Sequence, residues 1–305
     1  MTEQSTEPNL ILTRYLYSLS EVKHSLFLSI LDKKSDEALF WLYEIYYSGF
    51  PDAALEFITN IFNDVFAYDN PDLIKPFNRI INNFEENPSD NDDISFGTMV
   101  HNMCLRKYRI EHFMKTYLGI ICEPSPNVTK KNLYITLKRD NIQKYETKPS
   151  IEKTYMYLRV ACEYPIRKEG NKVFGEDIDT KEQYLNNWLY YAYGSPIWKD
   201  RVSEYGGKPD DEMLRIVFPD EEAESEFYDK WNMETDEQPM EVSNKITGDG
   251  SVCYMSATEF CIKYGGVMKT KKVLKIIKPL ENTISQGGIG GPPGSPSNPF
   301  PPFGK

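Results

Sequence analysis

Histidine and long apolar runs are what this 305-residue sequence most lacks. With only three histidines, it has few candidates for a site built from several imidazole ligands. No apolar run approaches the ~18–20 residues that cross a bilayer. The first ten residues, MTEQSTEPNL, lack the basic-then-apolar order of a signal peptide. We therefore expect a chain that has no membrane span and is not secreted.

Cysteine is also scarce, and its spacing excludes the usual cysteine frameworks. The five cysteines are odd in number and form no CxxC motif, so a disulfide framework or a four-thiolate zinc site is not expected. His101, Cys104, His112 and Cys122 are residues of the types that bind zinc, and they are candidates for a mixed site. Because apolar residues share their helical stripe, we interpret them as core residues and expect reduced, mostly buried thiols.

The common signatures of catalysis are missing as well. The sequence has no GxxxxGK[ST], no GxGxxG after a strand, no GxSxG and no HExxH. The acidic run at 89–93 (SDNDD) fails the calcium-loop pattern, and that at 219–224 (PDEEAE) suits a helix start. The sequence therefore predicts no catalytic, cofactor-binding or metal-binding residues. A non-enzymatic protein is the leading interpretation, with an unfamiliar active site as an alternative.

Helical periodicity dominates the first 120 residues. In residues 36–49 (DEALFWLYEIYYSG), apolar side chains fall at 39, 42, 43 and 46, which is the stripe of a buried helical face. Similar stripes cover 55–65, 73–84 and roughly 95–118. Short links between helices favour antiparallel neighbours. After a flexible segment at 1–9, we expect residues 10–122 to form an antiparallel helical bundle or a stack of helical hairpins.

The pattern changes after Pro124 and Pro126. Residues 128–139 and 155–164 alternate between apolar and polar side chains, which predicts strands, and 213–218 (MLRIVF) predicts another. Helices are expected at 180–193, 220–231 and 257–264. Residues 123–280 are thus expected to form a mixed α+β region, and the fold class of the whole chain is predicted as α+β.

The last segment is a tail rich in proline and glycine. Residues 285–305 contain six prolines and six glycines, a composition that cannot bury a core. We predict a disordered tail over 281–305. Its PxxP spacing favours an extended polyproline II segment that docks on a partner. The candidate docking residues are Pro293, Pro296, Pro299, Phe300, Pro301, Pro302 and Phe303.

Charge is unevenly distributed along the chain. The net charge is −11, yet residues 101–172 carry 15 Lys and Arg against 7 Asp and Glu, a net of +8. Tyrosines are interleaved with these bases, a mixture that contacts phosphates and stacks on bases. The candidate nucleic-acid contacts are Arg106, Lys107, Arg109, Lys115, Lys130, Lys131, Lys138 and Arg139. The alternative is that acidic helices of the same chain neutralise them.

A second basic stretch lies near the tail. Residues 263–278 contain six lysines and no acidic residue, with valine, leucine and isoleucine among them. Its apolar residues are too few for a helix that lies on a membrane surface. A strand or a partner-docking segment is therefore expected here.

Three segments carry a resemblance to a known family. They are 20–50 (SEVKHSLFLSILDKKSDEALFWLYEIYYSGF), 195–208 (SPIWKDRVSEYGGK) and 227–239 (FYDKWNMETDEQP), and the run at 37–50 is the most specific. The chain resembles an uncharacterised protein family of mimivirus-like giant DNA viruses over most of residues 15–240. Isoleucine outnumbers alanine 25 to 8, which agrees with an AT-rich genome. The resemblance implies no activity and no site residues.

The resemblance does imply where the protein acts. Infected host cytoplasm, a viral factory or the virion are the expected places. Together with the missing catalytic motifs, it predicts a virion or infected-cell accessory protein that binds viral or host proteins. The alternative is a nucleic-acid-binding factor of viral transcription or replication that uses the basic segment at 101–172. No cofactor is expected.

Overall fold

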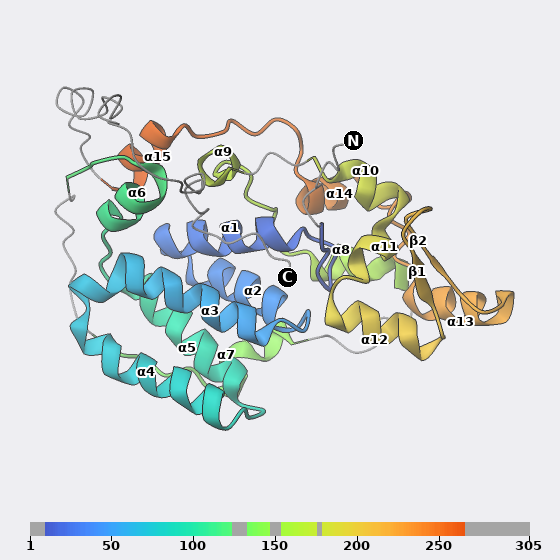
Figure 1. Ribbon diagram of the computed structural model, residues 1–305, viewed down its shortest axis with the longest axis horizontal. Coiled ribbons are helices and arrows are strands. Elements are labelled where there is room, and N and C mark those ends of the chain that lie inside the picture. Colours follow the sequence, from blue (N-terminus) through green and yellow to red (C-terminus); the bar gives the residue numbers. More distant parts are fainter. Residues whose placement is uncertain (1–9, 124–132, 147–153, 176–178, 266–305) are drawn as a thin grey trace, which may run out of the picture.

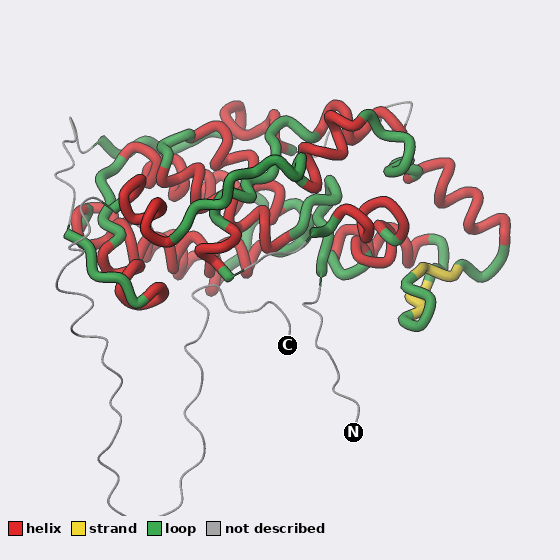
Figure 2. Tube along the Cα trace, turned by 90° about the horizontal axis from the view of Figure 1, so that it is seen from above, coloured by secondary structure: helices red, strands yellow, loops and turns green. Residues whose placement is uncertain are grey.

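The computed structural model describes residues 10–123, 133–146, 154–175 and 179–265 (Figure 1). This part of the chain is mostly helical, with one small antiparallel sheet of two strands (Figure 2). The α+β prediction is therefore correct only in that both kinds of element occur. The predicted segments at 1–9 and 281–305 lie outside the described residues.

The helices expected in the first 120 residues are present. They are α1 (Leu19–Leu31), α2 (Ser35–Tyr46), α3 (Pro51–Ile61), α4 (Pro71–Glu86), α5 (Asp92–Leu105) and α6 (Glu111–Leu118), with a π-helical turn η1 (Phe62–Phe66) and a 3₁₀ turn η2 (Ala67–Asp69) after α3. The single helix expected at 95–118 is wrong. Arg106 adopts an extended backbone (φ −102°, ψ 162°) and ends α5, and α6 begins five residues later.

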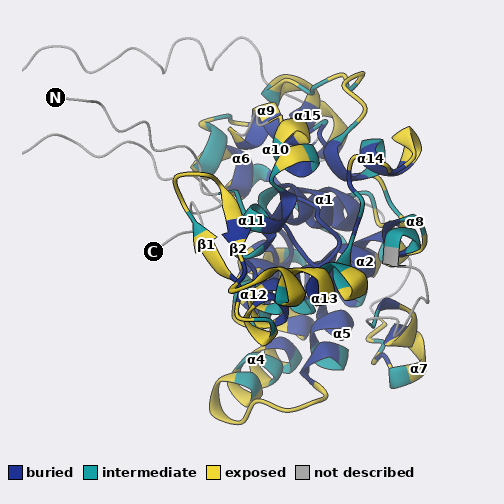
Figure 3. Ribbon diagram, turned by 90° about the vertical axis from the view of Figure 1, so that its right-hand side faces the viewer, coloured by how far each residue is buried: buried dark blue, intermediate teal, exposed yellow. Residues whose placement is uncertain are grey.

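Helix α1 is the centre of the molecule (Figure 3). Twelve of its thirteen residues are buried, including Glu21, Lys23 and His24. A helix buried all round needs neighbours on every side. Helix α2 packs along one side of α1 and is itself covered by α5, while Glu21 lies 3.2 Å from Lys168 Nζ of a distant segment. Both halves of the chain therefore enclose α1.

The second half consists of short helices joined by irregular links. They are α7 (Arg139–Ile142), η3 (Gln143–Tyr145), η4 (Thr154–Met156), α8 (Tyr157–Ala161), α9 (Asn171–Phe174), α10 (Lys181–Asn186), α11 (Trp188–Ala192), α12 (Pro196–Glu204), α13 (Glu221–Trp231), α14 (Met240–Thr247) and α15 (Ala257–Tyr264). The helices expected at 220–231 and 257–264 are confirmed as α13 and α15. The helix expected at 180–193 is interrupted at Asn187.

Two of the three predicted strands are not found in the described residues, and positions 128–132 of the first lie outside them. Residues 133–138 are neither helix nor strand, and 139–145 are helical turns. Residues 154–161 are helical, because tertiary packing overrides β-propensity there: Tyr157 and Leu158 are buried side by side, whereas Val160 is 47% exposed. The strand expected at 213–218 is confirmed as β2 (Arg215–Val217), which pairs with β1 (Lys208–Asp210).

The chain before α1 ties distant parts together. Trp198 Nε1 donates to the carbonyl of Thr13 (3.1 Å), and Tyr17 Oη donates to the carbonyl of Tyr164 (2.8 Å). The backbone N–H of Leu12 donates to the carbonyl of Tyr191 (3.1 Å). Buried apolar residues from Leu12 to Tyr264 consequently form one continuous core.

Candidate functional site

The predicted basic cluster does not form one exposed surface. Arg106 is 1% exposed, its Nη1 lies 2.8 Å from Asp72 Oδ2, and its Nη2 donates to the carbonyl of Leu133 (3.2 Å). Arg139 Nη1 lies 2.5 Å from Asp93 Oδ2 and 3.0 Å from Glu146 Oε1. These two guanidinium groups bind carboxylates of the same chain.

The other predicted bases are more accessible but scattered. Arg109 is partly buried, and its Nε donates to Asp69 Oδ2 (2.7 Å). Lys107 is half-buried, whereas Lys115 and Lys138 are exposed. Lys130 and Lys131 lie outside the described residues. The structure thus leaves Lys107, Arg109 and Lys115 accessible on the α5–α6 part of the chain, buries Arg106, and pairs the partly exposed Arg139 with carboxylates.

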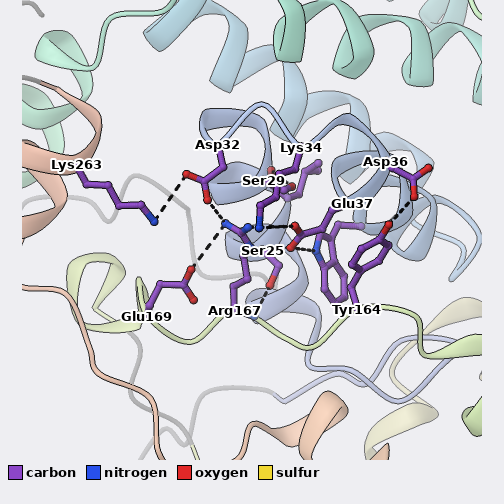
Figure 4. Close-up of polar contacts among 12 residues, drawn as sticks. Ser25, Ser29, Asp32, Lys34, Asp36, Glu37, Tyr164, Arg167, Glu169 and Lys263 are labelled. Carbon is purple, nitrogen blue, oxygen red and sulfur yellow. Dashed lines mark hydrogen bonds and ion pairs between the residues drawn. The ribbon is translucent and has the colours of Figure 1, made fainter.

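A network around Arg167 contains residues that the sequence analysis missed (Figure 4). Arg167 Nε donates to Glu37 Oε1 (2.6 Å) and its Nη2 to Glu37 Oε2 (3.1 Å), while Nη1 donates to Asp32 Oδ2 (2.7 Å). Lys263 Nζ, on α15, lies 3.8 Å from Asp32. Burial opposes the charge, but the hydrogen bonds to Glu37 and Asp32 raise the pKa of Arg167. The guanidinium is therefore held charged between α1 and α2.

A pocket of about 590 Å³ opens beside this network, at the amino terminus of α2. Its walls are residues 34–37, 164–167 and 169. Burial opposes ionisation of Asp36, yet hydrogen bonds from Lys144, Tyr145 and Tyr164 lower its pKa to about 2. Lys34 Nζ lies 3.5 Å from Glu37 Oε2. These pairs hold the start of α2 against the segment around Tyr164 and Arg167.

A group of exposed apolar side chains lies at one end of the molecule. We define the hairpin lobe as residues 208–231, which comprise β1, β2 and α13, and which project at that end (Figures 1 and 2). Met213 is 60% exposed, Val217 44% and Leu214 36%. The lobe has nine acidic against three basic residues, a net charge of −6. Exposed apolar side chains inside a charged rim are typical of interaction surfaces.

The turn of the hairpin places Leu214 in an unfavourable backbone conformation. Its φ is +48°, in the left-handed region, where a residue with a Cβ is disfavoured by roughly 1–2 kcal/mol. Asn187 Nδ2 donates to the carbonyl of Leu214 (3.0 Å), and Tyr190 Oη donates to Asp211 Oδ1 (3.0 Å). The two bonds fix the hairpin on α11 with Leu214 in this conformation.

A groove of about 320 Å³ separates the hairpin from α11 and α13. Trp188 and Leu189 line it from α11, Ile216 and Val217 from β2, and Glu224 and Tyr228 from α13. Sequence reasoning found β2 but not the groove, because its three walls come from segments that only the fold brings together.

Other candidate sites are weaker in the part of the chain that the structure describes. No three His, Cys, Asp or Glu side chains within it lie close enough to share a metal ion. Of the mixed ligands considered from the sequence, His101 Nδ1 lies 2.6 Å from Ser35 Oγ, and Cys104 and Cys122 are buried. None of the described helices has the length and apolar character to cross a membrane. Comparison with protein-family models, with curated proteins and with solved structures finds no match to this chain.

Proposed function

We propose that this chain is a non-enzymatic accessory protein that works by binding other proteins, and that the hairpin lobe is its docking surface. The observation that carries the proposal is the exposed trio Met213, Leu214 and Val217, within a lobe of net charge −6. Leu214 supports it further, since a strained residue that exposes an apolar side chain is a feature expected where function outweighs stability.

The place of action follows from the resemblance of residues 15–240 to the giant-virus family. We propose that the protein acts in the infected host cell, in the cytoplasm or a viral factory, or is packaged in the virion. Mass spectrometry of purified particles separates these places. Absence from particles would remove the virion role and leave the infected-cell role.

Cross-linking from the lobe tests the docking surface. Lys208 and Lys230 lie on the lobe and react with amine cross-linkers, so a bound partner is captured at known positions. We expect a triple variant with Met213→Ser, Leu214→Asn and Val217→Thr to lose these cross-links. Met240→Ser is the matched control, because Met240 is 77% exposed but lies on α14. Equal cross-linking by wild type and triple variant would overturn the proposal.

A second candidate function is nucleic-acid contact at the α6 end. Arg109 stacks over Tyr68 (4.5 Å to the ring centroid), and Tyr68 is 78% exposed, an arrangement suited to stacking on a base. Asp64 and Glu111 line the same hollow and disfavour phosphates. If this surface binds single-stranded RNA, fluorescence anisotropy at ~50 mM salt detects it, and Lys107→Glu with Lys115→Glu weakens it. No binding by the wild type at that salt removes this candidate.

A further inference from the structure

Arg201, on α12, is a buried arginine that pairs with no carboxylate of the described residues. It is 7% exposed, and its Nη1 is buried and has no hydrogen-bond partner among them. The other buried guanidinium groups differ, since those of Arg14, Arg106 and Arg167 lie 2.9, 2.8 and 2.6 Å from a carboxylate oxygen. An arginine keeps its proton in a protein, so the positive charge of Arg201 is left uncompensated within this part of the chain.

Two tryptophan rings form a corner around the Arg201 guanidinium. Its Cζ lies 4.4 Å from the ring centroid of Trp198 and 3.9 Å from that of Trp231. The two rings are inclined by 74° to each other, so they make adjacent walls and not a sandwich. Helices α12 and α13, which carry them, lie side by side (Figures 1 and 3). The rings stabilise the cation through their faces, but an indole offers no hydrogen-bond acceptor.

Two further donors without an acceptor lie beside Arg201. Trp231 Nε1 belongs to a ring that contacts the guanidinium, and it is buried with no hydrogen-bond partner in the described residues. The hydroxyl of Tyr157, on α8, is buried in the same way. Tyr157 is a neighbour of Arg201, because burial lowers the pKa of Arg201 and the interaction with Tyr157 opposes that shift. Three side chains that can donate hydrogen bonds thus meet around one charge.

The charge decides which kind of acceptor fits these donors. Burial raises the pKa of Tyr157, so its hydroxyl stays protonated and cannot serve as the counter-charge. A water molecule accepts hydrogen bonds but leaves a buried charge uncompensated. An oxyanion does both, because its oxygens accept charge-assisted hydrogen bonds from a guanidinium.

We propose that Arg201, Tyr157 and Trp231 form a binding site for a small oxyanion, a carboxylate or a phosphate group. Arg201 supplies the charge, the other two residues supply further donors, and the walls of Trp198 and Trp231 keep water from the ion pair. Trp231 is the last residue of the hairpin lobe, but the site does not depend on the exposed apolar side chains of that lobe.

Tryptophan fluorescence of the full chain tests the site, because two of the four tryptophans line it. We expect a saturable change on titration with sodium phosphate or with sodium acetate, and no such change with sodium chloride at equal ionic strength. The tighter of the two oxyanions distinguishes a phosphate site from a carboxylate site. An equal response to chloride, or no response to either oxyanion, would overturn the proposal.

Substitutions assign the response to these residues. Arg201→Met removes the charge, keeps an unbranched apolar side chain, and should abolish the response. Lys199→Met is the matched control, because Lys199 lies on the same helix, is exposed, and loses the same charge. Its response should equal that of the wild type. Tyr157→Phe removes only a hydroxyl and should weaken binding about tenfold. An unchanged response in Arg201→Met would exclude this site.

Unfolding in urea separates binding from a structural role of Arg201. Without oxyanions, Arg201→Met should unfold at a higher urea concentration than the wild type, because it removes a buried charge that lacks a partner. Phosphate strengthens folding of both proteins in general, but only the wild type should gain further from binding, so the gap should shrink. If Arg201→Met is instead less stable and phosphate leaves the gap unchanged, Arg201 is structural and the proposal is wrong.

A carboxylate of the same chain is the competing occupant. Glu152 precedes Tyr157 by five residues and lies outside the described residues. If Glu152 fills the site, the wild type should not respond to added oxyanions, whereas Glu152→Gln should respond. That pair of results would overturn the proposal of an external ligand.

Discussion

Arg14 Nε donates to Glu44 Oε2 at 2.9 Å, and both side chains are almost completely buried, 1% and 0% exposed. Thr13 Oγ1 and the backbone N–H of Tyr15 donate to the other carboxylate oxygen of Glu44 (2.6 and 3.0 Å). The carboxylate therefore fixes the chain before α1 against α2. A buried charge that loses its partner is costly, whereas an exposed pair contributes little.

We predict that Glu44→Ala lowers the free energy of unfolding by about 3–5 kcal/mol, because it leaves Arg14 charged in the interior. Urea denaturation followed by circular dichroism measures the loss. Glu204→Ala is the control, since Glu204 pairs with Lys230 at 3.2 Å on the surface and is 58% exposed. Its change should stay below about 1 kcal/mol. Equal effects of the two substitutions would contradict this interpretation of Glu44.

His24 makes stability depend on pH below neutrality. Burial, with a smaller effect of Lys23, lowers the pKa of His24 from 6.5 to about 3. Between these values the unfolded chain binds a proton that the folded chain does not bind, so His24 destabilises the fold progressively as pH falls from 6.5 toward 3. One proton corresponds to a slope of ~1.4 kcal/mol per pH unit. We expect His24→Gln to reduce the slope of unfolding free energy between pH 6 and pH 4 by about this amount, and an unchanged slope would be contrary evidence.

Asp36 makes the stability of the protein depend on pH in a lower range than His24 does. Its pKa is about 2 in the folded protein against 3.8 ordinarily, so the stability it contributes is complete above pH 4 and is lost as pH falls toward 2. We expect Asp36→Asn to destabilise the protein at pH 5 and to have little effect near pH 2. Because the side chain is 53% exposed, solvent screening keeps the difference small. Denaturation curves of both proteins at several pH values measure it, and a difference that grows toward pH 2 would exclude this role.

Leu214 allows stability and binding to be separated. Asn tolerates the left-handed conformation better than Leu or Ala. We therefore expect Leu214→Asn to exceed Leu214→Ala in unfolding free energy by about 1 kcal/mol, although both remove the apolar side chain. Both should weaken docking on the hairpin lobe equally. If Leu214→Ala weakened docking and the more stable Leu214→Asn did not, docking would depend on stability and the side chain of Leu214 would have no role in it.

The proline-rich tail makes a prediction of its own. Its candidate residues from Pro293 to Phe303 lie outside the described residues, so the expectation rests on the sequence. If they dock on a partner, a chain ending at Ser285 should lose that partner in affinity capture from infected cells. The shortened chain still contains the hairpin lobe, so partners of the lobe should remain. An identical set of partners for both chains would show the tail to be passive.

The periodicity of apolar residues along the sequence predicted the N-terminal helices well. It predicted the residues of the candidate site poorly. The stripe at 39, 42, 43 and 46 predicts the helix α2 correctly, because helical periodicity is a local signal. It does not predict that the residues between, including Glu44, are buried as well. Alternation at 155–164 predicted a strand wrongly. A strand needs a partner strand, and what the fold supplies there is the packing of Tyr157 and Leu158 into the core.

The charged sites depend on pairs that are distant along the chain. Arg106 and Arg139 look like surface bases in the sequence, but Asp72 and Asp93, 34 and 46 residues away, bind them in the fold. Nothing in the local sequence identifies these partners. Glu37 and Glu44 carried a partial signal, since both lie in an aromatic-rich helical run where a charge needs compensation.

The bidentate bond between Arg167 and Glu37 joins residues separated by 130 positions. At ~5–20 residues per second, a ribosome needs roughly ten seconds to make the chain between them. During that interval α1 and α2 have left or are leaving the ribosome without Arg167, Lys168 and Asn171, which cover Glu21 and Glu37 in the finished protein. The centre of the molecule is thus made first and completed late, and nascent chains are most exposed to proteases and chaperones before residue 171 emerges.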